Sequence, residues 1–429
     1  MNIKVQGGQV LSGTITPSGS KNSAVAVIPA TILFDKPITL KNIPDITDVT
    51  RLVSILENMG SKISWDKENN SLTIDNSEIK YSPVTKENIG NMRGTSLLWG
   101  PMLARFGKVS FEELPGGCTL GIRPLGAHYD AFKSLGVDIE LSSQSVVMDA
   151  KSAKSATIWL ADMSPTVTEN AVMLSATLKG TTTIIGAASE PQVQDLCRLL
   201  VTSGAKIEGI GSSVLTIVGV SELTPPKEYE IFPDHYEIAT FLALGATTGG
   251  EIRVNNAMPD LFGQIDHVFS EFGINIRYED KTAIVSGGQK IKINNEGNGT
   301  LDIKAQPWPG LPVDMLPLFI PIALSAESGS ALFHNWMYES GLFWTSELSK
   351  LGANIIMADP HRVIVNAGNK LVGAKLEAPY IIRAVVAMTM CAMTAKGETT
   401  ILNADALYRG HPNFAKNLKN LGAKIEETQ

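Results

Sequence analysis

The sequence predicts an α/β protein built from six similar units, three in each of two domains. Two short patterns recur six times along the 429 residues: a helical segment that ends in glycine, and a turn that leads into a strand of alternating β-forming residues. A Pro-rich, charged stretch, LTPPKEYE, lies near the middle of the chain and places a domain boundary near residues 229–233.

The first pattern is an amphipathic stretch that ends in glycine and leads into a short β-rich run, as in LCRLLVTSGAKIEG. Each glycine stands where a helix needs a left-handed residue, a conformation that only glycine adopts without steric cost. The spacing of 68 to 79 residues exceeds the ~20–50 residues of simple solenoid repeats and favours compact domains. The six glycines are Gly60, Gly136, Gly204, Gly273, Gly352 and Gly422.

The second pattern precedes each of these helices and consists of a turn, a strand and a loop. Its six copies read KPITLKNIP, GKVSFEELP, GTTTIIGAA, GEIRVNNAM, GSALFHNWM and GETTILNAD. Several copies follow an apolar helix, such as AVMLSATLKG. The repeated unit is therefore helix–strand–loop–helix–strand. A cleft between two such domains is an expected ligand site, because pockets favour domain interfaces.

Composition excludes several classes of protein. The net charge of −7 argues against a nucleic-acid partner, and the apolar runs are too short to span a bilayer. Three cysteines cannot form a disulfide framework, and the six histidines show no spacing typical of a metal site. The first residues lack the apolar core of a signal peptide. We expect a soluble, cytoplasmic protein without a metal, nucleic-acid or membrane partner.

The segment EELPGGCTLGIRP is the loop most suited to function. It holds three glycines, Cys118 and Arg123 within thirteen residues. Glycines permit close approach of the backbone to a ligand, and a neighbouring cation can lower a thiol pKa and make the thiol reactive. The alternative is an ordinary turn with an incidental thiol.

Four other positions, three of them charged, lie in informative places. Lys21 and Asn22 fall near a helix start, which favours an anion, although a surface lysine beside a helix-capping serine explains the same residues. Arg383 opens an apolar helix and needs either an anionic ligand or an internal ion pair. Asp314 lies in the apolar context LPVDMLPLFI and is either a partly desolvated general base or a helix cap.

Taken together, these motifs resemble the enolpyruvyl transferases, in particular the members that act on UDP-N-acetylglucosamine in peptidoglycan synthesis and, more distantly, those that act on shikimate phosphate. The resemblance runs almost end to end and includes SGSKN, LPGGCTLGIRP, ATLKGTTTI, FPDHYEIATFL, PVDMLP and RGHPNFAKNLKNLGA. It implies a two-domain inside-out α/β barrel with three repeats per domain, residues 22–231 forming one domain and residues 1–21 with 232–429 forming the other.

The resemblance also implies an activity. The enolpyruvyl group of phosphoenolpyruvate moves to a sugar hydroxyl with release of phosphate, by addition and elimination, and no metal or organic cofactor takes part. Lys21, Cys118 and Asp314 match the catalytic residues, the cysteine being the one that fosfomycin alkylates. Arg123 and Arg409 match the residues that hold the phosphate. We expect a monomer or a weak homo-oligomer.

Five further positions match substrate-binding residues of the family. Asn22 falls on the asparagine that contacts the acceptor, Arg383 on one arginine of the carboxylate clamp and Arg93 on another active-site arginine. Ser164 in SPTVTEN and Glu339 in YESGLFW complete the predicted set.

The sequence also departs from the family pattern. Gly341 stands where the second clamp arginine is expected, and losing one bidentate contact would cost about 1.5–3 kcal/mol of binding. Ile381 and Tyr408 replace acids, and Leu97 replaces a tryptophan, although Trp99 follows two positions later. The departures in the acceptor-binding segments are Gly126, Pro165 and Thr166.

Three functions are consistent with this pattern. The first is enolpyruvyl transfer to UDP-N-acetylglucosamine, and the second is the same transfer to another nucleotide or sugar nucleotide in a specialised pathway. The third is a non-catalytic relative that binds a nucleotide sugar. Retention of the loop cysteine together with the cations disfavours the third, because a binding protein has no use for that thiol.

Overall fold

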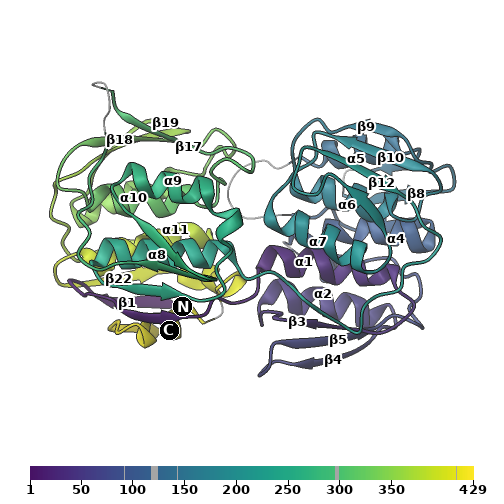
Figure 1. Cartoon of the computed structure of the whole chain (residues 1–429), viewed down its shortest axis with the longest axis horizontal. Helices are drawn as coiled ribbons and strands as arrows, with labels where there is room; N and C mark the ends of the chain where they lie inside the picture. The colour runs from purple at the N-terminus through teal and green to yellow at the C-terminus, as the bar shows by residue number, and fades with distance from the viewer. Residues whose placement is uncertain (91, 117–123, 143, 295–298, 412) are drawn as a thin grey trace. The chain divides into compact units, whose positions relative to one another are not determined.

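The computed structural model describes residues 1–90, 92–116, 124–142, 144–294, 299–411 and 413–429 (Figure 1). Contacts divide these residues into two compact units, and the division falls between Ser18 and Gly19 and between Phe232 and Pro233. Unit 1 consists of Met1–Ser18 and Pro233–Gln429, and unit 2 consists of the described residues from 19 to 232. The boundaries expected from the sequence, 21/22 and 231/232, differ by three residues and by one.

Unit 2 holds three sheets of one topology, in which two antiparallel pairings are joined to one parallel pairing at an edge. Its first sheet has the order β13 (Glu228–Glu230), β3 (Ile38–Lys41), β5 (Ser71–Asp75), β4 (Lys62–Asp66). The second has the order β6 (Lys108–Phe111), β8 (Val146–Asp149), β7 (Asp138–Leu141), and Val84 supplies a parallel bridge to Phe111. The third has the order β11 (Lys206–Glu208), β12 (Val214–Val218), β10 (Thr181–Ile185), β9 (Thr157–Trp159).

Unit 1 repeats this topology in three sheets. The first has the order β15 (Ile276–Glu279), β16 (Thr282–Val285), β14 (Ile252–Val254), β2 (Gly13–Ile15). The second has the order β17 (Leu301–Lys304), β18 (Ser330–His334), β20 (Arg362–Asn366), β19 (Asn354–Asp359). The third has the order β21 (Lys375–Glu377), β22 (Glu398–Leu402), β1 (Asn2–Gln6), β23 (Ile425–Thr428). All six turn–strand segments expected from the sequence are therefore strands.

The N-terminal residues complete unit 1. Strand β1 pairs with β22 on one side and with β23 on the other, while β2 pairs in parallel with β14. Strand β13 closes unit 2 in the same way, because it pairs with β3 just before the chain enters unit 1. Each unit is thus closed by a segment distant in sequence from the strands it joins.

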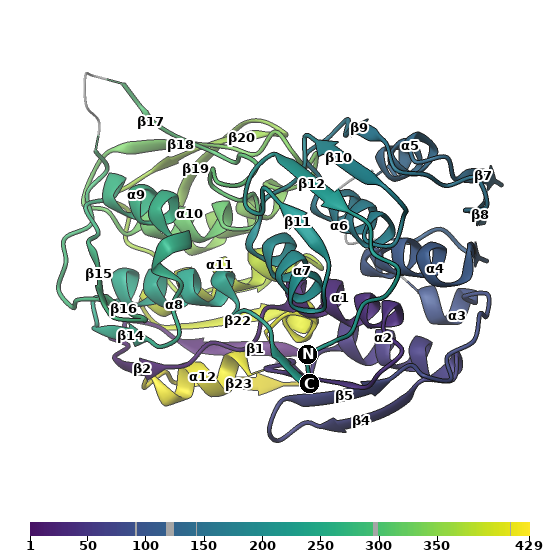
Figure 2. The same cartoon turned by 45° about the vertical axis from the view of Figure 1, so that its right-hand side comes forward.

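Largely buried helices form the centre of each unit. In unit 1 they are α8 (His235–Thr248), α10 (Leu316–Leu324) and α11 (Ile382–Thr394), which contact one another and are buried almost throughout (Figure 1). In unit 2 they are α1 (Lys21–Ala30), η2 (Arg93–Leu98) with α4 (Trp99–Phe106), and α6 (Pro165–Ser175). Sheets lie above and below these helices in both views (Figures 1 and 2). This is the inside-out α/β arrangement that the sequence predicts.

The remaining helices cover the outer parts of the units. In unit 2 they are η1 (Thr31–Leu33), α2 (Thr47–Asn58), α3 (Lys86–Ile89), α5 (Gly126–Ser134) and α7 (Pro191–Thr202). In unit 1 they are η3 (Pro259–Leu261), α9 (Gly263–Glu271), η5 (Phe343–Leu351), η6 (Ala404–Arg409) and α12 (Phe414–Asn420). Across the described ranges, no helix has the length and apolarity needed to cross a membrane.

All six repeat glycines end a helix in the left-handed conformation, with φ between 70° and 105°. Five follow the last cap residue of α2, α5, α7, α9 or α12, and Gly352 is itself the cap of η5, a 3₁₀ helix. The residue after each glycine donates its N–H to a carbonyl of the last turn, as Ala205 does to Leu200 at 2.9 Å. These paired bonds satisfy carbonyls that a helix end would otherwise expose.

Candidate active site

The predicted site residues that the structure describes lie mostly at the beginnings of the central helices. Lys21 and Asn22 open α1, Arg93 opens η2, and Ser164 is the residue before α6. Asp314 precedes α10 by two residues, and Arg383 is the second residue of α11. Helix N-termini carry partial positive charge and unpaired N–H groups, so these ends favour an anion.

The three central helices of unit 1 run in the same direction. Thr247 of α8, Ser325 after α10 and Thr394 of α11 line one pocket, so the C-terminal ends of these helices meet. Their N-terminal ends therefore lie together at the opposite end, where Tyr236 of α8 contacts Arg383 of α11. Unit 1 thus gathers three positive helix ends where Asp314 and Arg383 lie.

In unit 2 the start of η2 lies beside α1, and α4 contacts the middle of α6. Gly94, at the start of η2, lies beside Val25 in the second turn of α1. The backbone N–H of Gly100 in the first turn of α4 donates to Oδ1 of Asn170 on α6 at 2.7 Å. The repeated topology therefore places Lys21, Arg93 and Ser164 on corresponding ends of three neighbouring helices.

Lys21 forms an ion pair within unit 2. Its Nζ lies 3.1 Å from Oδ2 of Asp48 in the first turn of α2, and the two side chains are 19% and 10% exposed. Ser20 caps α1 by accepting the N–H of Ser23 at 3.2 Å. The helix-capping serine expected as an alternative is thus present, but Lys21 is largely buried and not a surface lysine.

Arg93 contacts the described end of the glycine-rich loop. Its NH2 donates to the carbonyl oxygen of Pro124 at 2.8 Å. Burial raises the pKa of Tyr129 on α5, and the positive charge of Arg93 opposes that rise. Cys118 and Arg123 lie outside the residues that the structure describes.

Ser164 begins a short polar chain. Its Oγ lies 3.5 Å from Oγ1 of Thr166, which lies 3.0 Å from Nε2 of the buried His128 on α5. Pro165 occupies the first position of α6, a position that suits proline because its missing N–H would be unpaired there. The two departures from the family pattern thus give α6 a proline start and a hydroxyl bonded to His128.

The other three predicted residues of unit 1 differ in burial. Asp314 is half-buried and lies one residue before Met315, the cap position of α10, so it does not cap that helix. Arg409 ends η6 and packs over the ring of Tyr380 at 5.4 Å. Glu339 is exposed in the turn between β18 and η5.

Arg383 has neutral partners. It is 8% exposed, its NH1 contacts Nε2 of His411, and its guanidinium packs 4.6 Å from the ring centroid of Tyr236. Among the described residues, no carboxylate lies within ion-pair distance of Arg383. In place of a direct ion pair, Arg383 contacts an imidazole and a tyrosine ring, and its charge interacts with the buried carboxylate of Asp234.

Two titratable residues near Arg383, Asp234 and His235, have shifted pKa values. Burial alone would raise the pKa of Asp234, but the charge of Arg383 is the largest opposing influence, and the pKa lies below its usual value. Burial lowers the pKa of His235 to about 4, so its imidazole is neutral at pH 7. Asp234 caps α8 by accepting the N–H groups of Tyr236 and Glu237.

Gly341 is enclosed by its neighbours. A Cβ atom at this position would lie 2.1 Å from Nδ2 of Asn335, which is 3% exposed and accepts the N–H of Tyr338. Trp344 donates its Nε1 to the Gly341 carbonyl at 3.0 Å. An arginine side chain at position 341 would require Asn335 to move, so the departure at this position is built into the local packing.

The other positions that depart from the family pattern differ in how they pack. Leu97 and Trp99 are both buried, and Trp99 stacks on Tyr129 in the core with ring centroids 5.9 Å apart. Trp99 is therefore a core residue. Ile381 is the residue before α11 and packs against the core of unit 1, while Tyr408 is 41% exposed and its hydroxyl lies 3.4 Å from Glu427.

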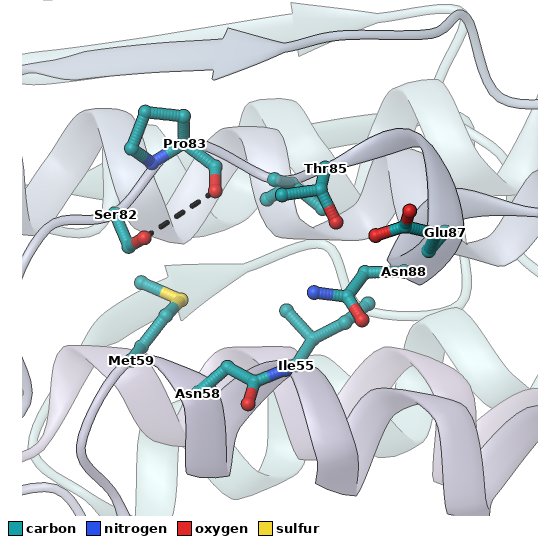
Figure 3. A pocket seen from close by; sticks show the side chains of 9 residues that line it. Ile55, Asn58, Met59, Ser82, Pro83, Thr85, Glu87 and Asn88 are labelled. Atoms are coloured by element: carbon teal, nitrogen blue, oxygen red, sulfur yellow. Dashed lines mark hydrogen bonds between the residues drawn. The ribbon is translucent and has the colours of Figure 1, made fainter.

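A separate pocket in unit 2 contains none of the predicted residues. It has a volume of about 300 Å³ and lies between the second half of α2 and the segment that ends in α3 (Figure 3). Ile55 and Met59 face Pro83 and Thr85 across it (Figure 3). The pocket is thus distinct from the helix starts that carry the candidate residues.

Comparison with known proteins places this chain in a family. Residues 5–418 match the family model of EPSP synthase (3-phosphoshikimate 1-carboxyvinyltransferase). The UDP-N-acetylglucosamine 1-carboxyvinyltransferase of Treponema denticola is 38% identical over 424 residues, which cover 98% of each chain. The protein of the same name from Borreliella burgdorferi is 36% identical over 426 residues, 99% of this chain and 98% of that one. The chain belongs to the EPSP synthase family, and it is an enolpyruvyl transferase.

Solved structures share the fold. The enolpyruvyl transferase NikO from Streptomyces tendae matches with a TM-score of 0.87 at 22% identity, over 99% of this chain and 98% of that one. EPSP synthase from Acinetobacter baumannii matches with a TM-score of 0.75 at 16% identity over both whole chains. These matches confirm the two-domain inside-out α/β fold.

Several residues that lie beside the predicted ones were not expected from the sequence. Asp48, the partner of Lys21, carries no local signal, because it resembles any acid in a first helical turn. Glu237 could have been expected from the sequence, because it lies in the apolar helix DHYEIATFLALG. A charge in such a helix, like that of Arg383, is rarely buried without a partner. His411 lies in RGHPNF, where nothing marks it as buried.

Proposed function

We propose that this enzyme transfers the enolpyruvyl group of phosphoenolpyruvate to a hydroxyl of UDP-N-acetylglucosamine and releases phosphate. The observation that carries the proposal is the end-to-end similarity to relatives that bear this activity in their names, at 36–38% identity. The cations at the helix starts support the phosphoenolpyruvate half, because this substrate carries a phosphate and a carboxylate.

The residues predicted for the site take distinct parts in the proposed reaction. Lys21 and Arg409 bind the phosphate, and Arg383 binds the carboxylate of phosphoenolpyruvate. The oxygen of the acceptor hydroxyl bonds to C2 of phosphoenolpyruvate while Asp314 accepts the proton of that hydroxyl. Cys118 donates a proton to C3 in the same step. Loss of a proton from C3 and departure of phosphate then give the enolpyruvyl ether. Asn22, Arg93, Ser164 and Glu339 contact the substrates, and Arg123 holds the phosphate.

The test is phosphate release from phosphoenolpyruvate with a panel of acceptors. We expect release with UDP-N-acetylglucosamine and a product heavier by one enolpyruvyl group, and no release without an acceptor. Asp314→Asn should lower kcat by at least ~10²-fold, because general-base catalysis contributes that much. Turnover with a different sugar nucleotide alone would replace the proposed acceptor, and no turnover with any acceptor would contradict the proposal.

Fosfomycin provides a control that does not depend on the acceptor. We expect one adduct per chain by intact mass, absent from Cys118→Ser, because Cys197 and Cys391 are fully buried. Burial raises the pKa of Cys197 to about 12 and that of Cys391 further still, so neither forms a thiolate at pH 8. An adduct that persists in Cys118→Ser would contradict the assignment of the reactive thiol.

A second candidate acceptor is another nucleotide or sugar nucleotide. The observation in its favour is the start of α6, where Thr166 lies within 3.0 Å of His128 and Pro165 fixes the helix start. A second departure from the family pattern, Gly341 packed against Asn335, also favours a different acceptor. The acceptor panel distinguishes the two candidates through the kcat/KM of each nucleotide.

A further inference from the structure

Arg383 occupies an electrostatically unfavourable place. It is 8% exposed, and it is the second residue of α11, whose first turn contains no acidic side chain. A helix N-terminus already carries partial positive charge, and a buried cation there requires support from its surroundings. The residues that provide this support determine how the guanidinium is oriented.

Besides the nearby carboxylate of Asp234, the support includes a chain of buried hydrogen bonds within unit 1. NH1 of Arg383 contacts Nε2 of His411, and Nδ1 of His411 lies 3.0 Å from Oε1 of Glu237 on α8. The other carboxylate oxygen of Glu237 accepts the backbone N–H of Ser18 at 2.7 Å. The side chains of His411 and Glu237 are 1% and 2% exposed, so water does not compete for these bonds.

The two neighbours of His411 determine its protonation. A guanidinium only donates hydrogen bonds, so Nε2 must present its lone pair to Arg383. The carboxylate of Glu237 accepts, so Nδ1 carries the proton. His411 is therefore a neutral imidazole in the Nδ1–H form.

This arrangement leaves one edge of the guanidinium for a ligand. His411 engages NH1 and the Tyr236 ring covers one face, whereas the Nε–NH2 edge retains the parallel pair of donors that a carboxylate binds. Because a neutral imidazole separates Glu237 from Arg383, the arginine is fixed in place without a direct carboxylate contact. The direct contacts of its guanidinium are thus uncharged, and its charge also interacts with the buried Asp234.

We propose that His411 and Glu237 are positioning residues that orient Arg383 for the carboxylate of phosphoenolpyruvate. This inference rests on the proposed function, in which Arg383 binds that carboxylate. The groups beside His411 are Glu237 of α8, Asp234 at the cap of that helix, Arg383 of α11 and the ring of Phe414 on α12.

Two amide substitutions separate the two bonds of His411. His411→Gln can place its amide oxygen near the former Nε2 and still accept from Arg383, whereas the shorter side chain of His411→Asn reaches only Glu237. We expect His411→Asn to raise the KM for phosphoenolpyruvate about tenfold, the loss of one charge-assisted bond, with little change in kcat or in the KM for the acceptor. His411→Gln should stay within about threefold of the wild type.

Equal KM values for phosphoenolpyruvate in the two variants would overturn the proposal. Should either variant fail to fold, Glu237→Gln serves instead, and it should weaken phosphoenolpyruvate binding more than acceptor binding.

The tautomer of His411 can be measured without any activity. Nuclear magnetic resonance of the full-length protein with ¹⁵N-labelled histidine should show, at pH 7, the signal of a neutral Nδ1–H imidazole that is lost in His411→Gln. A charged or Nε2–H imidazole would overturn the positioning role even in an active enzyme. If the expected tautomer is found but no acceptor gives turnover, the proposed function fails while the arrangement of Arg383 stands.

Discussion

At the scale of single residues, the molecule places several ionisable groups where water cannot reach them. Glu169 on α6 is 2% exposed, and burial, assisted by the charge of Glu190 before α7, raises its pKa to about 8. The side chain is therefore protonated at neutral pH in the folded protein. An unfolded glutamate has a pKa near 4.5, so Glu169 links folding to proton binding.

The sign of this linkage gives a prediction. Between pH 4.5 and about 8 the folded state holds a proton that the unfolded state releases, so the contribution of Glu169 to stability falls as pH rises. Glu169→Gln, which resembles the protonated acid, should match the wild type near pH 5 and exceed its unfolding free energy by about 3–5 kcal/mol at pH 9. Urea unfolding at several pH values measures this difference.

A matched control is Glu190→Gln. Burial is the larger cause of the raised pKa, so this variant should keep most of the pH dependence. A Glu169→Gln protein whose stability changes with pH as steeply as the wild type would show that Glu169 does not titrate in this range.

At the scale of elements, the glycine that ends each outer helix has a conformational role that can be separated from packing. Helix α9 has a glycine at its start and another just beyond its end. Gly263 is its first residue, and Gly273 follows its cap residue with a φ of 70°. A Cβ at Gly263 would meet no atom within 4 Å, and one at Gly273 would come no closer than 3.4 Å to the carbonyl oxygen of Lys290. The two positions therefore differ mainly in backbone conformation.

Alanine at these two positions should have opposite effects. Gly273→Ala should destabilise the protein by about 1–2 kcal/mol, because a left-handed residue with a Cβ is strained. Gly263→Ala should raise stability by about 0.4–1 kcal/mol, because alanine restricts the unfolded chain and suits a helix. Thermal unfolding of both variants measures this contrast. An equal loss of stability in the two variants would show that backbone conformation does not account for the effect of Gly273→Ala.

The same elements show how far the sequence predicts the fold. The six glycines and the six turn–strand segments are local signals, and all twelve lie where the structure needs them. The site is predicted less completely, because its support comes from distant segments: His411 and Glu237 are 174 residues apart in the chain. Hydrophobic periodicity contains no signal for such pairs. Likewise, the packing of Asn335 against Gly341 appears only once β18 and η5 are in place.

At the scale of the whole molecule, the chain closes each unit with a distant strand. In unit 1, β1 lies between β22 and β23, so residues near the start and near the end of the sequence form one sheet. Val5 in β1 is fully buried in the core that contains α8 and α11, whereas Lys4 beside it is exposed. Unit 1 thus depends on a strand that precedes all of unit 2 in the sequence.

This dependence gives a prediction about both units. Val5→Asn should destabilise unit 1 by about 2–4 kcal/mol, because it buries an amide in an apolar core, while Lys4→Asn should change stability by less than about 0.5 kcal/mol. Hydrogen exchange measures where protection is lost. We expect faster exchange across residues 233–429 and unchanged exchange across residues 19–116, although the substitution is only fourteen residues from the start of unit 2. Faster exchange confined to β1 and its two partners, or spread equally over both units, would contradict the view that β1 is an integral part of the core of unit 1.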